Sequence, residues 1–142
     1  GNSALIEYLK YTAPGFIYSV GMSPANTAAA LAAIQTLKVQ PKLVENLHAR
    51  AKLFLKLAQK YQLNTGFSQN TPIIPIIIGD SFKCIKLSQL LFQRGINVQP
   101  MIYPSVPEKM ARLRFFISSK HTEEQIHLTL NAIVQELENL QN

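Results

Sequence analysis

Two arginines, two positions apart, are the residues of this sequence best suited to chemistry. Arg112 and Arg114 lie in the segment 111–118, where apolar and polar residues alternate. Alternation is typical of a half-buried strand, so both arginines are expected on the face opposite the apolar set. A guanidinium fork pairs with both oxygens of a carboxylate or phosphate, and a strand holds it rigidly. The spacing alone favours two ordinary solvent-facing arginines, and an anion-binding pair is the alternative that the guanidinium chemistry offers.

The other reactive side chains form no recognisable catalytic set. Ser118, Ser119 and His121 superficially resemble a nucleophile with its base, but no acid follows at a useful spacing. Ser19 lies in a segment expected to be extended before a helix start, where its hydroxyl either donates to an anion or completes a turn. Cys84 is expected to be a small buried apolar residue. No catalytic residue and no metal ligand is therefore assigned.

The composition is that of an ordinary globular domain. Of 142 residues, 47% are apolar and 15% are charged, with a mean hydropathy of +0.07. Such a chain buries enough apolar surface to offset its ordering entropy, which excludes disorder. One cysteine, three scattered histidines and no CxxC pair exclude structural zinc and redox-pair chemistry and fit a reducing, cytoplasmic setting. The longest apolar run, 73–78, contains Pro75 and is too short to cross a bilayer.

The net charge of +6 raises the question of nucleic-acid binding. Four lysines of the segment 41–61 are expected on the side of a helix opposite its apolar stripe, as on any solvated helix face: Lys42, Lys52, Lys56 and Lys60. Tryptophan is absent, and no motif that reads DNA or RNA is present. Nucleic-acid binding is therefore the last of the candidate functions.

The elements that must carry the arginines are expected in a two-layer α+β domain of about three strands backed by helices. Caps, breakers and hydrophobic periodicity place them along the chain. The expected helices cover 3–11 (the end of a helix), 23–37, 41–61, 81–94 and 122–140. The expected strands cover 73–78, 96–99 and 111–118, with an extended segment at 15–21 and a loop at 101–108. Pro75 places the first strand at a sheet edge or a bulge.

Six blocks, read together, resemble the C-terminal part of the α-oxoamine synthases, pyridoxal phosphate enzymes with the type I aminotransferase fold. The blocks are FIYSVGMSP (16–24), PIIPIIIGD (72–80), RGINVQP (94–100), PSVP (104–107), ARLRF (111–115) and HTEEQI (121–126). The resemblance implies that residues 1–41 are the end of a large domain and a connecting helix. Residues 42–142 would be the small C-terminal α+β domain.

The resemblance also implies roles for individual residues. Arg114 occupies the position whose arginine binds the carboxylate of the amino-acid substrate, and Arg112 is given a supporting role. Ser19 matches a hydroxyl that reaches the cofactor phosphate of the neighbouring subunit, although Val20 does not match the second hydroxyl of that motif. His121 matches a histidine for which a structural role before the last helix is expected.

In this family, the lysine that forms the Schiff base with pyridoxal phosphate lies upstream of these blocks. None of the ten lysines of this chain has the expected setting, so the segment alone is expected to be inactive, beginning just after that lysine. The implied whole protein is a homodimeric acyltransferase that uses an amino acid and acyl-CoA or an acyl carrier protein. It would be either a stand-alone enzyme or a polyketide-synthase module. Aminotransfer and a non-catalytic anion-binding or regulatory module are the alternatives.

Overall fold

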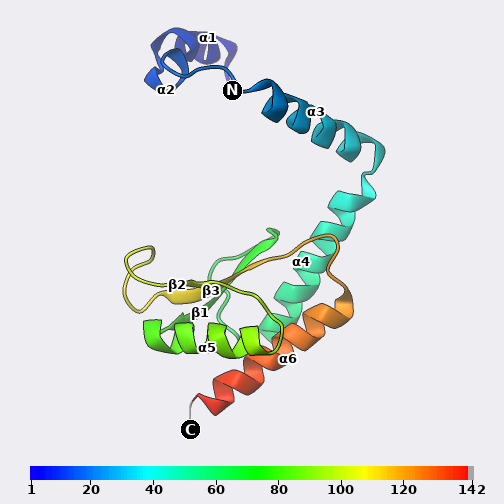
Figure 1. Ribbon diagram of the computed structural model, residues 1–142, viewed down its shortest axis with the longest axis vertical. Coiled ribbons are helices and arrows are strands. Elements are labelled where there is room, and N and C mark those ends of the chain that lie inside the picture. Colours follow the sequence, from blue (N-terminus) through cyan, green and yellow to red (C-terminus); the bar gives the residue numbers. More distant parts are fainter. Residues whose placement is uncertain (141–142) are drawn as a thin grey trace. The chain divides into compact units, whose positions relative to one another are not determined.

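The computed structural model describes residues 1–140, which divide into two compact units, Gly1–Gln40 and a second unit from Pro41 onward. The first unit contains three helices, labelled in Figure 1: α1 (Ser3–Thr12), α2 (Pro14–Ile17) and α3 (Pro24–Val39). None of their residues is buried. This unit therefore has no hydrophobic core of its own.

The helix starts of the first unit follow local sequence signals. Ser23 caps α3, as expected, because its hydroxyl accepts the N–H of Asn26 and Pro24 occupies the first turn. The expectation of an extended segment at 15–21 is wrong in its first part, where α2 forms a short turn of helix. Pro14 occupies the first turn, where the fixed φ of proline suits a helix, and the carbonyl of Ala13 accepts the N–H groups of Phe16 and Ile17.

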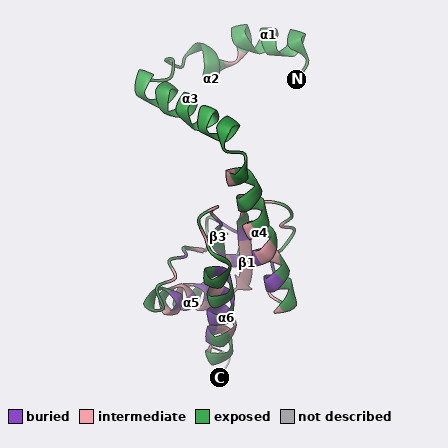
Figure 2. Cartoon of the chain, turned by 90° about the vertical axis from the view of Figure 1, so that its right-hand side faces the viewer, coloured by how far each residue is buried: buried purple, intermediate pink, exposed green. Residues whose placement is uncertain are grey.

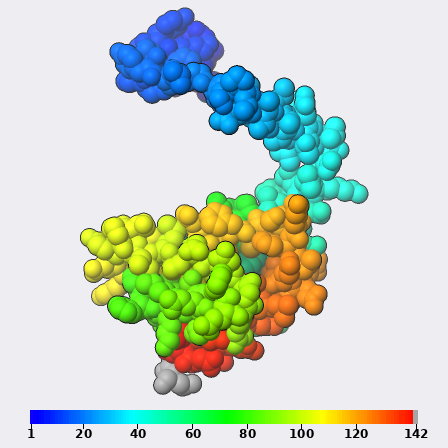
Figure 3. Space-filling model, in the orientation of Figure 1, coloured from blue at the N-terminus to red at the C-terminus, as the bar shows by residue number. Residues whose placement is uncertain are grey.

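The second unit has the expected two-layer α+β architecture. Its elements are α4 (Lys42–Lys60), β1 (Ile73–Gly79), α5 (Ser81–Gln93), β2 (Pro100–Met101), β3 (Ala111–Phe116) and α6 (Glu123–Asn139). The three strands form an antiparallel sheet in the order β1-β3-β2. Figure 3 shows the segments of this unit closing into one body, and a single core cluster joins the sheet to α4, α5 and α6.

Strand β3 is the centre of the sheet and shows the expected alternation. Its apolar residues Ala111, Leu113 and Phe115 are buried, and Ile117 continues the series. The ring of Phe115 packs on Phe54 of α4, with centroids 5.1 Å apart. The four lysines of α4 are exposed, as expected for a solvated helix face. Figure 2 shows the buried residues in the helices and strands of this second unit, whereas α1, α2 and α3 are drawn as exposed.

Pro75 lies on an edge strand, as expected, opposite Arg114 of β3. The N–H of Ile117 donates to the carbonyl of Pro72 at 2.8 Å, so residues 117 and 72 face each other in the β1–β3 ladder as a hydrogen-bonded pair. Because such pairs alternate with non-bonded pairs, Pro75 falls at a non-bonded position. Its missing N–H then costs no ladder hydrogen bond, which explains why proline is tolerated in this strand.

The expectation of a strand at 96–99 is wrong, since β2 consists of Pro100 and Met101 instead. The segment before β2 is bound to α5 rather than to β3. The N–H of Ile96 donates to the carbonyl of Leu91 at 2.9 Å, and the hydroxyl of Ser88 donates to the carbonyl of Val98 at 2.6 Å. These bonds direct the segment away from the sheet, so β2 begins later, at Pro100, and its second residue, Met101, lies in the expected loop.

No helix within residues 1–140 is long and apolar enough to cross a membrane. Over the same range, no group of three or more His, Cys, Asp or Glu side chains is arranged to hold a metal ion.

Candidate functional site

Strand β3 brings Arg112 and Arg114 onto the sheet face opposite the core, as their spacing predicts. Arg112 is half-buried, and its Nε donates to the carbonyl of Met110 at 3.0 Å. Arg114 is exposed, and its guanidinium carbon lies 5.0 Å from the centre of the Phe116 ring. None of the ion pairs found within the described range involves either arginine. The guanidinium of Arg114 is therefore available to an external anion.

The edge of β3 beside Arg114 is open. Hydrogen-bonded pairing with β1 uses the odd-numbered residues of β3, so the backbone groups of Arg112, Arg114 and Phe116 point toward the β2 side. Arg112 pairs there with Met101. The chain on the other side of Pro100 would meet Arg114 and Phe116 if β2 were longer, but it is held by α5. The recorded β2–β3 pairing ends at Pro100 opposite Leu113, so no residue of β2 pairs with Arg114 or Phe116.

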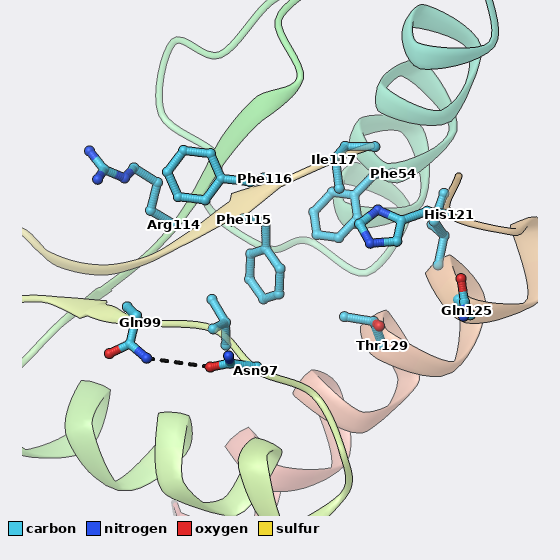
Figure 4. A pocket seen from close by; sticks show the side chains of 12 residues that line it. Phe54, Asn97, Gln99, Arg114, Phe115, Phe116, Ile117, His121, Gln125 and Thr129 are labelled. Carbon is cyan, nitrogen blue, oxygen red and sulfur yellow. Dashed lines mark hydrogen bonds between the residues drawn. The ribbon is translucent and has the colours of Figure 1, made fainter. Parts of the chain in front are cut away.

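This divergence of two chain segments produces a pocket of about 330 Å³. One wall is the segment 97–99, the other is the C-terminal half of β3, and α4 and α6 complete it. The pocket residues are Phe54, Asn97, Val98, Gln99, Arg114, Phe115, Phe116, Ile117, His121, Gln125, Ile126 and Thr129. Figure 4 shows Arg114 at one end and His121 at the other, with side-chain amides and a hydroxyl between them.

The amide and hydroxyl side chains of this pocket, Asn97, Gln99, Gln125 and Thr129, were missed by the sequence interpretation. Gln99 donates to Asn97 at 3.3 Å, whereas Gln125 belongs to the capping box of α6. No local sequence signal could have grouped them, because they meet only where the segment 97–99 leaves the sheet. The pocket is thus a consequence of tertiary structure.

His121 has contacts of a structural kind, in agreement with the role expected for it. Its Nδ1 accepts the N–H of Ser118 at 3.0 Å, and its own N–H donates to the carbonyl of Ser118 at 3.1 Å. The hydroxyl of Ser118 accepts the N–H of Lys120. These bonds close the turn between β3 and α6, and they occupy His121 Nδ1 with the N–H of Ser118 instead of its hydroxyl. A nucleophile–base pair is therefore not formed here.

Ser19 belongs to the first unit, so the pocket beside β3 is built without it. Its hydroxyl is exposed and donates to the carbonyl of Phe16 at 2.9 Å, completing the turn that follows α2. The hydroxyl could donate to a phosphate only after releasing this carbonyl. The residues described here do not by themselves fit pyridoxal phosphate as a complete site.

Comparison with known proteins places this geometry in a family. The family model described as "Aminotransferase class I and II" matches residues 1–133. The chain is 40% identical over 130 residues to the 8-amino-7-oxononanoate synthase of Thermosipho melanesiensis, covering 92% of this chain and 33% of that protein. It is 39% identical over 142 residues to the corresponding synthase of Pseudomonas putida, covering 100% and 36% respectively. The chain spans about a third of the length of these curated relatives.

Solved structures show the same fold. A crystal structure of 8-amino-7-oxononanoate synthase from Francisella tularensis matches with a TM-score of 0.80 and 27% identity, covering 99% of this chain and 41% of that one. A serine palmitoyltransferase from Sphingomonas wittichii matches with a TM-score of 0.78 at 20% identity, covering 95% and 34%, which is a likeness of fold alone. The chain therefore belongs to the aminotransferase class I and II family, and the resemblance to α-oxoamine synthases expected from its sequence is confirmed.

Proposed function

We propose that the protein carrying this chain is a pyridoxal phosphate-dependent acyltransferase of the α-oxoamine synthase type, which condenses an amino acid with an acyl thioester. The family match and the synthases to which the chain is similar support this proposal. The observation that carries it is the guanidinium of Arg114, which is mounted on the central strand at the rim of a pocket and has no ion-pair partner within residues 1–140.

In this proposal Arg114 holds the carboxylate of the amino-acid substrate. A bidentate pair between guanidinium and carboxylate fixes both the distance and the plane of the bound group. Arg112 supports the site, because its bond to the carbonyl of Met110 holds a second positive charge on the same sheet face. Pyridoxal phosphate, when bound, supplies an electron sink for the substrate carbanion. Ser19 would contribute a hydroxyl to the phosphate of that cofactor.

The whole protein also needs parts and partners that are proposed together with this activity. Residues 1–41 would form the end of the large domain and a connecting helix, and residues 42–142 the small domain. The acyl group would arrive on coenzyme A or on an acyl carrier protein, the latter if the parent is a polyketide-synthase module. A homodimer in the cytoplasm is the proposed assembly. To distinguish the two donors, the same acyl group is supplied either on coenzyme A or on an acyl carrier protein, and the turnover rates are compared.

Replacing Arg114 in the full-length protein tests the proposal. Loss of a charge-assisted hydrogen-bonding pair in Arg114→Ala is expected to raise the KM for the amino acid by about 10- to 100-fold. Arg114→Lys should recover part of that loss, because an ammonium group keeps the charge but not the fork. Cofactor absorbance should remain unchanged in both variants. Steady-state kinetics at varied amino-acid concentration measure these effects.

Lys86→Ala is the matched control, because Lys86 is an exposed cation on α5 and does not line the pocket. Its KM should equal that of the unaltered enzyme. An unchanged KM in Arg114→Ala would remove Arg114 from the substrate site and, with it, the observation on which the proposal rests.

A further inference from the structure

Phe116 is a large apolar side chain that lies outside the core. It is the last residue of β3, it is 58% exposed, and it lies on the same sheet face as Arg114. The residue opposite it in the ladder, Ile73, is itself 45% exposed. Core packing therefore does not account for an aromatic residue at this position.

The ring of Phe116 contacts the guanidinium of Arg114 instead. The guanidinium carbon lies over the ring, 5.0 Å from its centre. A cation at this distance is attracted by the negative face of the aromatic system. Figure 4 shows Arg114 and Phe116 on one side of β3, with Phe115 on the other. The contact is thus made along the strand, between residues two positions apart.

An aromatic partner has a consequence that an acidic partner would not have. A carboxylate would occupy the N–H groups of the guanidinium and neutralise its charge, whereas a ring face restrains the group and uses none of its donors. Arg112 shows the contrast within the same strand, because its Nε is already bonded to the carbonyl of Met110. Arg114 keeps its donors and its charge for a ligand.

Arg114 is flanked by a strand on one side only. Pro75 of β1 lies opposite it, but β2 ends at Pro100, opposite Leu113, and places no residue opposite Arg114. A long flexible side chain loses conformational entropy when it binds a ligand, and restraining it beforehand lowers that cost. Phe116 is the aromatic residue in position to provide this restraint.

We propose that Phe116 is a positioning residue for Arg114: its ring holds the guanidinium beside the pocket with its donors free for a substrate carboxylate. This inference rests on the proposed function. It adds Phe116 as a residue that acts through Arg114, and it requires an aromatic side chain at position 116.

Phe116→Leu and Phe116→Tyr in the full-length enzyme test the role of the ring. Loss of the cation–aromatic contact in Phe116→Leu is expected to raise the KM for the amino acid by about twofold to fivefold, with kcat unchanged. Phe116→Tyr keeps an aromatic face and should restore the original KM. Glycine, L-alanine and L-serine serve as probes, and the one that is turned over fastest is used. Phe92→Leu is the matched control, because Phe92 is a 66% exposed aromatic residue on α5 outside this pocket.

Repeating the Phe116 substitution in an enzyme that lacks Arg114 distinguishes positioning of Arg114 from direct contact between Phe116 and the substrate. In an Arg114→Ala enzyme, adding Phe116→Leu should cause no further change in KM, because the ring then has no guanidinium to hold. The affinity of methylamine or ethylamine, which lack the carboxylate, should be equal in the unaltered enzyme and in Phe116→Leu. A further rise in KM in the double variant, or a weaker amine affinity, would overturn the positioning role.

The outcomes also separate this inference from the proposed function. If Arg114→Ala raises KM strongly but Phe116→Leu matches the Phe92→Leu control, the positioning role is refuted and the substrate site stands. If Arg114→Ala itself leaves KM unchanged, the substrate site is refuted and the role of Phe116 falls with it. Thermal unfolding of each variant shows whether a change in KM reflects loss of folded enzyme.

Discussion

The two units of this chain differ in what their apolar residues do. In the first unit, large apolar side chains of α3 such as Leu31, Ile34 and Leu37 are 46–55% exposed, and no helical residue is buried. In the second unit, the apolar residues of β1, β3 and the three helices form one core cluster. Both units are rich in apolar residues, so composition alone does not produce a core.

The difference lies in how the apolar residues are arranged. Helix α4 segregates its residues, with Ala51, Phe54 and Ala58 buried on one side and its lysines exposed on the other. Helix α3 is built around a run of alanines, which offers no bulky stripe and no clear polar face. An amphipathic helix gains most of its stability from packing its apolar face on another element. In the second unit, the sheet provides such a surface for α4.

Replacing one leucine in each unit should give the largest contrast. Leu113 is fully buried on the central strand, so Leu113→Ala is expected to lower the free energy of unfolding by about 2–5 kcal/mol through lost burial and the cavity left behind. Leu31→Ala, on the 54% exposed side chain of α3, should change it by less than about 0.5 kcal/mol. Denaturant titrations followed by circular dichroism measure both values.

The leucine comparison fails if the two variants lose similar stability. A large loss in Leu31→Ala would mean that α3 takes part in the cooperative unfolding of the second unit. The division into two units would then not describe the energetics of the chain.

Replacing one partner of an ion pair in each unit should give the second-largest contrast in stability. Arg94 pairs with Glu136 of α6, whose carboxylate is buried at 6% exposure, and also donates to Gln135 at 2.7 Å. Arg94→Met leaves that carboxylate buried without its cation and is expected to cost about 1–3 kcal/mol of stability. Lys10 and Glu7 form a pair in α1 in which both side chains are about half exposed. Lys10→Met should cost less than about 0.5 kcal/mol.

Salt provides the check on this second contrast. Any contribution from the exposed pair should disappear in high salt, whereas the buried carboxylate of Glu136 is screened much less. Equal losses in Arg94→Met and Lys10→Met, measured as shifts in the denaturation midpoint, would mean that burial does not set the strength of these pairs.

Local signals predicted much of the fold. The alternation of 111–118 correctly predicted which β3 side chains enter the core, and the capping box of Thr122 and Gln125 correctly predicted the start of α6. Both depend on residues close in the sequence, where geometry follows directly from spacing. The turn of α2 was missed, because the segment 15–21 was expected to be extended although Pro14 marks the start of a helical turn.

The candidate site was likewise predictable from the sequence only in part. The arginine pair was predictable, since two positions of one strand must share a face. The pocket beside Arg114 was not, because the segment 96–99 alternates like a strand but is bound to α5 through Leu91, which accepts from Ile96, and Ser88, which donates to Val98. The sequence cannot show which of two partners a segment will choose when both offer hydrogen bonds. That choice opens the edge of β3 and forms the pocket.

Cys84 gives the smallest expected effect, because the reactivity of its thiol can be measured without changing any side chain of the core. It is fully buried on α5. Burial raises the pKa of its thiol from 9.0 to about 11. The negative charge of Asp80 adds to this rise, whereas a hydrogen bond with the Met101 backbone lowers the pKa. Since the raised pKa favours the protonated folded form, this contribution to stability is complete below pH 9.0 and is lost as the pH rises through about 11.

At about pH 8 the folded chain should react very slowly with a thiol reagent, because Cys84 is buried and protonated. A shortened chain beginning at Pro41 should show the same slow rate, because every residue of the core cluster lies beyond position 50. A faster reaction in the shortened chain would mean that residues 1–40 protect the core, and the two units would then have to be treated as one.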